Sequence, residues 1–294
     1  MMEITGFNQK HDAHMLQLLK EATGGQNLDS ARFQLLLLGS AGREEQLRFA
    51  DQDHMMICSE GAEAEAAAVG ETFSSLLEAS GYPRCEGGVM AGNDMWCRTE
   101  ASMEKQLRRW IEKRDWESLR YILIFYDARP LHGPGDTTVR LKQLTSSLIQ
   151  EYGLEAAMFQ NTRFRLKRRN VFGQILTDQK GDINMKKDLL FPYANAARAA
   201  AAAEGITVAA TKLRLEQLSF RHPHLKPVSS SFQKLLEFRR EKSASAASYE
   251  DVHLLRVDEL TKAEMKQVKH WMKEGKKVTN DLRSVYSRER ADQR

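Results

Sequence analysis

Apolar runs and amphipathic segments alternate over the first 130 residues. Short apolar runs bounded by glycine or polar residues predict buried strands, and helical spacing that ends at glycine predicts helices. Expected strands cover 32–38, 49–58 and 82–91; expected helices cover 11–24, 63–80 and 100–113, while 119–126 fits either type. Strands mixed with helices over this length predict an α/β or α+β domain, which we take as α+β.

The second half follows a different pattern, in which almost every segment has helical spacing. His132-Gly133-Pro134-Gly135 interrupts the chain, so we predict one domain over 1–135 and another over 136–294. Expected helices cover 139–152, 154–176, 189–204, 207–218, 229–242 and 262–286. These predict an all-helical bundle, with the alanine-rich stretch 196–203 as a strong helix former.

Charge divides the chain at the same place. Residues 1–135 hold 14 Lys and Arg against 21 Asp and Glu (−7), and residues 136–294 hold 30 against 19 (+11). An acidic half suits a divalent metal and a basic half suits phosphate or an acidic partner, although solvated helix faces explain any single charge. Three cysteines without paired spacing and no apolar run near the roughly 20 residues of a membrane span predict a cytoplasmic protein.

The segment with the most chemistry joins an apolar strand to Gly39-Ser40 and continues to Asp51-Gln52-Asp53. On a strand over 49–58, Asp51 and Asp53 share one face. Two adjacent carboxylates favour a hard cation such as Mg²⁺ or Mn²⁺ between them.

Gly39 lets backbone approach a phosphate, and Ser40 offers a hydroxyl and an N–H to it. Arg43 either orients phosphate or braces the loop by pairing with Glu45. The arrangement predicts in-line attack on a nucleotide α-phosphate.

Gly39-Ser40-x-Gly42-Arg43-x-Glu45 followed by Asp51-x-Asp53 resembles the signature of the polymerase-β-type nucleotidyltransferase superfamily. The similarity is greatest to the branch of PII uridylyltransferase and glutamine-synthetase adenylyltransferase. Within it, the chain resembles nucleotidyltransferases of bacterial signalling proteins, often fused to CBS domains. Segments 81–91, 127–133 and 182–188 resemble later landmarks of that family, so the similarity reaches the helical half.

This resemblance implies a mixed-sheet catalytic domain followed by a helical substrate-binding domain. It implies transfer of a nucleoside monophosphate from an NTP to a protein or small acceptor, in signalling or regulation. It also implies a third carboxylate on a later strand, for which Glu86 is the first choice and Asp94 and Asp127 are alternatives. Glu44 stands where relatives often carry glycine and His54 where they carry an apolar or amide residue. These departures leave a catalytically inactive nucleotide-binding regulatory module as the alternative.

Other chemistry-bearing residues have simpler interpretations. His132 is expected in a loop with a structural hydrogen bond, and Cys85 and Cys97 are expected as buried thiols instead of zinc ligands with His54. The basic run 163–169 is predicted as a helix that faces the catalytic cleft or a partner in preference to nucleic acid. Together with Lys186-Lys187, this run is expected to line the cleft and hold the outer phosphates of the NTP.

Overall fold

The computed structural model describes residues 2–25, 29, 32–49, 52–162, 181–249 and 251–292. Its packing separates two compact units, one of 1–148 with 207–210, the other of 149–206 with 211–294. The division falls inside helix α6 (Asp136–Glu151), whereas the predicted boundary lay at 135/136. No helix among these residues has the length and apolar character needed to cross a bilayer.

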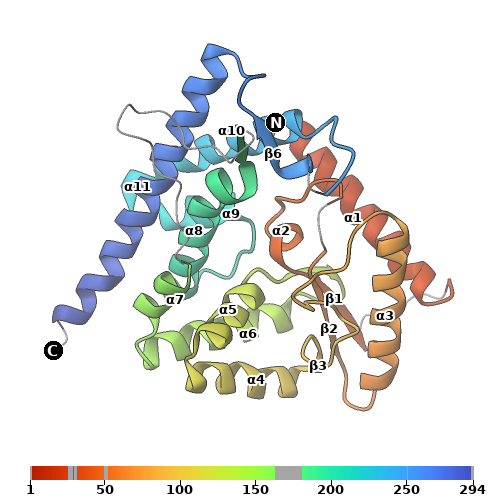
Figure 1. Cartoon of the computed structure of the whole chain (residues 1–294). Helices are drawn as coiled ribbons and strands as arrows, with labels where there is room; N and C mark the ends of the chain where they lie inside the picture. Colours follow the sequence, from red (N-terminus) through yellow and green to blue (C-terminus); the bar gives the residue numbers. More distant parts are fainter. Residues whose placement is uncertain are drawn as a thin grey trace. The chain divides into compact units, whose positions relative to one another are not determined.

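The first unit is built on a four-stranded mixed sheet of order β3-β2-β1-β4 (Figure 1). β1 (Phe33–Leu37) pairs antiparallel with β2 (His54–Cys58) and β4 (Arg129–His132), and β2 pairs in parallel with β3 (Cys97–Thr99). Helices α1 (Met2–Ala22) and α3 (Glu63–Ala79) lie side by side against one face. Between them and the sheet, the core holds Met15, Leu18, Phe33, Leu35, Met56 and Phe73.

Helices α4 (Glu100–Lys113) and α5 (Trp116–Tyr126) follow β3. α4 has the bounds predicted from its amphipathic pattern, because the Thr99 side chain caps its first turn by accepting from Ser102 N. Asp115 caps α5 in the same way, which resolves the ambiguous apolar run as helix. The rings of Trp96, Trp110 and Tyr121 pack together beside these helices, whereas Trp116 is exposed.

Two predicted strands are wrong in extent or place. β2 begins at His54, so Asp53 lies one residue before the strand, and Phe49 has a left-handed φ of 63° that ends any extended run there. Residues 82–91 form turns instead of a strand. Gly88, with φ of 65°, closes a turn by donating to the Cys85 carbonyl. The segment bonds to β2 only at His54, whose N donates to Val89 O and whose Nδ1 accepts from Ala91 N, among the described residues.

The second unit is helical apart from a two-stranded antiparallel sheet of β5 (Asp182–Asn184) and β6 (Leu254–Arg256), which the sequence pattern did not predict. Its helices are α7 (Glu155–Asn161), η1 (Met185–Leu190), α8 (Phe191–Glu204), α9 (Thr211–Leu218), η2 (Pro223–Leu225), α10 (Lys226–Lys242), η3 (Asp251–His253) and α11 (Lys262–Asp292). The predicted continuation of α7 over 163–176 lies outside the described residues.

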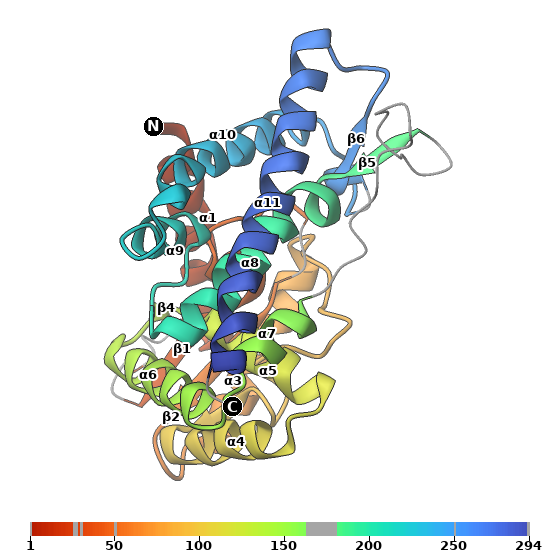
Figure 2. The ribbon, with the colours of Figure 1, turned by 90° about the vertical axis from the view of Figure 1, so that its left-hand side faces the viewer.

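Helix α8 forms the centre of this unit, and α11 runs along it (Figure 2). Its alanines from Ala196 to Ala203 are buried, because small side chains let neighbouring helices approach on several sides. At the crossing, a β-carbon at Gly275 of α11 would lie 2.7 Å from the ring of Tyr193. The α+β prediction, with a mixed-sheet domain followed by a helical region, is therefore confirmed.

Candidate active site

The ends of β1 and β2 bring Gly39 and Asp53 together. The ladder continues one step beyond the strands, since Leu38 N donates to the Asp53 carbonyl at 2.8 Å. Gly39 then opens the short helix α2 (Gly39–Gly42) with a left-handed φ of 52°. A β-carbon at position 39 would collide with Oδ2 of Asp53. The glycine thus leaves room for a carboxylate directly against the backbone that carries Ser40.

Arg43, the C-cap of α2, is buried in an ion-pair cluster. Its guanidinium donates to Glu45 at 2.9 Å and to Asp127 at 2.5 Å, and all three side chains are almost inaccessible to solvent. Burial alone would lower the pKa of Arg43, but the charges and hydrogen bonds of Glu45 and Asp127 raise it above its ordinary value. Of the two roles predicted for Arg43, this is the bracing arrangement with Glu45.

A second network connects helix α1 to both loops of the site. Arg129 of β4 makes a two-pronged ion pair with Asp12 at 2.7 and 2.9 Å and also donates to the Ala41 carbonyl at 3.2 Å. His11, next to Asp12, lies 3.2 Å from the amide oxygen of buried Gln52. The burial of Asp12 would raise its pKa, but hydrogen bonds from His11 and Arg129 lower it to about 2. The carboxylate therefore stays charged and holds α2 and the Asp53 segment to one helix.

The turn after α3 brings Cys85 to Asp53. Burial, and next the charge of Asp53 and a hydrogen bond to it, raise the pKa of the Cys85 thiol to about 12, so the protonated thiol donates to the carboxylate. Glu86 follows in the same turn and is exposed. The turn therefore places Glu86 one residue from a direct neighbour of Asp53.

His54 has a structural role. It is 1% exposed, its Nδ1 accepts from Ala91 N at 3.2 Å, and its ring packs edge-on against Phe73. Burial lowers its pKa to about 3, despite the opposing charge of Glu71. Cys97 is buried as predicted, Cys85 is half-buried, and His132 lies at the end of β4 instead of in a loop.

The other candidate residues divide into three groups. Asp51, the partner expected beside Asp53, lies outside the described residues, as does the basic run 163–169. Asp127 is committed to Arg43, and Asp94 is exposed in the turn before β3. Within the described ranges, which omit Asp51, no three His, Cys, Asp or Glu residues form a metal-binding group. Asp53 supplies the oxygen donor that a hard cation prefers, and a site for Mg²⁺ or Mn²⁺ would need at least one further carboxylate beside it.

Sequence reasoning missed the bracing roles of His11, Asp12 and Arg129. The segment 127–133 carried a signal, because it holds both Asp127 and Arg129 within a stretch that resembles a family landmark. The signal for Asp12 was absent, since one acid in an amphipathic helix resembles any solvated side chain. Only the fold brings it to Arg129, 117 residues away.

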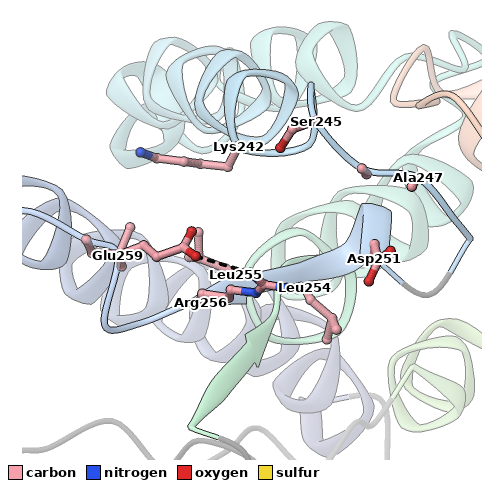
Figure 3. Close-up of a pocket in the computed structure, with 10 residues that line it drawn as sticks. Lys242, Ser245, Ala247, Asp251, Leu254, Leu255, Arg256 and Glu259 are labelled. Atoms are coloured by element: carbon pink, nitrogen blue, oxygen red, sulfur yellow. Dashed lines mark hydrogen bonds and ion pairs between the residues drawn. The ribbon is translucent and has the colours of Figure 1, made fainter.

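The second unit has a separate hollow of about 270 Å³ along β6, shown in Figure 3. Its charged side chains form ion pairs: Arg256 with Glu259 at 3.2 Å, and Lys242 with Glu264. Asp251 accepts from Ser248 at 3.0 Å. The charged side chains that line this hollow are therefore each bonded to a neighbouring group.

A mixed sheet that joins a Gly-Ser turn to an acidic residue, followed by a helical unit, is the arrangement expected of a nucleotidyltransferase with a substrate-binding domain. Two family models match the chain in this order. Residues 2–117 match "Putative nucleotidyltransferase DUF294" and residues 153–286 match "Putative nucleotidyltransferase substrate binding domain". The chain belongs to this nucleotidyltransferase family. A search of curated proteins found no match.

Proposed function

We propose that this protein transfers a nucleoside monophosphate from an NTP to a protein or small acceptor, in a regulatory or signalling context. Asp53 and Asp51 would hold a divalent cation, Mg²⁺ or Mn²⁺, and Glu86 would be the third carboxylate of the site. Gly39 and Ser40 would contact the phosphates. Membership of the nucleotidyltransferase family supports the reaction class.

The contact between Asp53 and Gly39 carries the proposal. Gly39 holds the Asp53 carboxylate directly against the backbone that carries the half-buried Ser40, so a phosphate bound next to Asp53 would lie near the Ser40 hydroxyl and N–H. A bound cation would neutralise charge on that phosphate and on the leaving pyrophosphate. The chain's own part is to keep these donors in place before substrate arrives.

Two ion-pair clusters, one buried and one half-buried, support that rigidity. Arg43 with Glu45 and Asp127 fixes the end of α2, and Arg129 with Asp12 holds the Ala41 carbonyl. Because both arginines brace the loop, the groups that contact the NTP would be the cation, Ser40 and the backbone amides. A misplacement of about 1 Å costs roughly 100-fold in rate, which is the physical value of such bracing.

The test is incubation of the full chain with Mg²⁺ or Mn²⁺, each labelled NTP in turn, and a panel of small and protein acceptors. Label should move to a defined acceptor. Asp53→Asn should lower transfer by roughly 100-fold or more while its unfolding curve stays close to wild type. Glu60→Gln removes the same charge from an exposed position after β2 and should leave transfer unchanged.

Equal activity of Asp53→Asn and wild type at saturating metal would contradict the proposed mechanism. Binding of NTP by the wild type without transfer to any acceptor would instead identify the chain as a nucleotide-binding regulatory module. Measuring NTP affinity beside transfer separates these results.

A further inference from the structure

His253, the last residue of η3, is buried in the second unit with an unsatisfied hydrogen-bond donor. The side chain belongs to a residue that is 6% exposed, and its Nδ1 lies 3.3 Å from Nη2 of Arg239. A guanidinium only donates, so Nδ1 accepts and the neutral ring carries its proton on Nε2. This Nε2 has no hydrogen-bond partner among the described residues. Buried donors without an acceptor are rare in native proteins, so a ligand that brings an acceptor oxygen to this N–H would be stabilised there.

Positive charge surrounds this donor. Burial is the largest cause that lowers the pKa of His253 to about 3, and Arg239, Lys186 and Lys187 follow. The strand register accounts for the two lysines. Asn184 of β5 pairs with Leu254 of β6, so the residues that follow Asn184 run beside the residue that precedes Leu254. Three cations around a neutral N–H favour an anionic acceptor.

Exposure differs across the cluster. His253 and Arg239 are buried, Lys186 is half-buried and Lys187 is exposed. Arg239 therefore fixes the tautomer of His253 inside the protein, whereas the two lysines lie nearer its surface. The hollow in Figure 3 is a different place, where Arg256 pairs with Glu259.

We propose that His253, Lys186 and Lys187 bind a phosphate group in the substrate-binding domain, with Arg239 as the positioning residue. The Nε2–H of His253 donates to one phosphate oxygen, and the two ammonium groups balance its charge. This inference rests on the proposed function for the source of the phosphate, which is either the acceptor or the NTP. The site itself requires only this unit's residues.

The experiment is a titration of the full chain with inorganic phosphate by calorimetry, without divalent metal and with chloride holding the ionic strength constant. Phosphate should bind, and Lys186→Met/Lys187→Met should weaken binding by roughly tenfold or more for each lost contact. The matched control is Lys276→Met/Lys277→Met, which removes two exposed neighbouring lysines from α11 of the same unit and should bind as wild type.

His253→Phe tests the part of the histidine in phosphate binding, since it keeps a ring against Tyr249 but removes both nitrogens. Weaker phosphate binding by this variant with a retained unfolding transition would support the site. If it fails to fold, the lysine pair carries the test alone. Wild-type phosphate affinity in the Lys186→Met/Lys187→Met variant, or an equal loss in the α11 control, would overturn the proposal.

Asp53→Asn separates this inference from the proposed function. The variant should retain phosphate binding, because Asp53 belongs to the first unit. Competition of metal-free NTP with phosphate in this variant would identify the NTP as the source, and competition only by a phosphorylated acceptor would identify the acceptor. Transfer activity in a wild-type chain that binds no phosphate would reject the site and keep the function.

Discussion

The carboxylate of Asp53 lies against the Cα of Gly39, so closely that a β-carbon at position 39 would overlap its Oδ2. Two independent constraints therefore require glycine here. The left-handed φ of 52° disfavours any L side chain, and the adjacent carboxylate excludes even a methyl group. The first constraint concerns stability, whereas the second concerns the position of a proposed metal ligand.

Gly39→Ala should separate these two effects from each other when it is compared with Gly61→Ala. Gly61 also has a left-handed φ, of 80°, but no other atom lies within 4 Å of the point where its β-carbon would stand. Each substitution should cost about 1 kcal/mol of unfolding free energy from backbone strain. Only Gly39→Ala should also displace Asp53 and lower transfer by roughly 100-fold.

Urea unfolding and labelled-NTP transfer measure the two quantities on the same preparations. Retained transfer in Gly39→Ala would show that the Asp53 carboxylate has no fixed place in the reaction. A transfer defect of equal size in Gly61→Ala would assign the loss to general destabilisation.

The buried cluster around Arg43 predicts a large stability effect. Asp127→Asn removes one of the two carboxylates that neutralise a guanidinium with little access to solvent, so unfolding free energy should fall by roughly 3–5 kcal/mol. Glu104→Gln breaks the exposed pair with Arg108 on α4 and should cost below about 0.5 kcal/mol. Similar small losses in both variants would show that Arg43 does not depend on Asp127.

Local features of the sequence predicted much of the fold. Helix α4 was placed at its observed bounds, since its apolar spacing and the Thr99 cap both act within one turn. The end of α3 was also predicted, where Gly81 takes φ of 88°. Residues 82–91 were wrongly predicted as a strand, because the pairing of an apolar stretch depends on neighbours that local pattern does not contain.

The candidate site was likewise predicted in part, where local sequence features determine it. Gly39 and Ser40 were placed at a strand end from the apolar run before them, and their approach to Asp53 follows from β1 and β2 being neighbours. The distance from Glu86 to that carboxylate depends on a turn whose shape comes from Gly88 and from the contact of Cys85 with Asp53. Such a contact across 32 positions has no periodic signature.

His54 predicts a pH dependence of stability. Its native pKa of about 3 is below the ordinary value of 6.5, so between these values the unfolded chain takes up a proton that the native chain does not. Stability should therefore fall as pH drops from 6.5 towards 3, by at most about 1.4 kcal/mol per pH unit from this residue. His54→Gln should flatten the slope of unfolding free energy against pH.

The control for this measurement is His270→Gln, an exposed histidine of α11, which should leave the slope as in wild type. Part of the slope should remain in His54→Gln, because His253 has its pKa lowered into the same range. A wild-type slope in His54→Gln would contradict the assignment.

The pair of Asp12 and Arg129 predicts a coupled effect on activity. Asp12→Asn and Arg129→Gln each break the link between α1 and the Ala41 carbonyl, so each should lower transfer, and the double variant should be little worse than either single one. The pKa of Asp12 is depressed to about 2, so its stabilising charge is present above its ordinary value near 3.8 and is lost only as pH falls through about 2. The coupling should accordingly be constant from pH 5 to 8.

Arg140 and Glu100 form an equally two-pronged but exposed pair, at 2.9 and 2.8 Å, and the same cycle on them should leave transfer unchanged. Additive losses in the first cycle would mean that Asp12 and Arg129 act separately, and α1 would then have no part in holding the site.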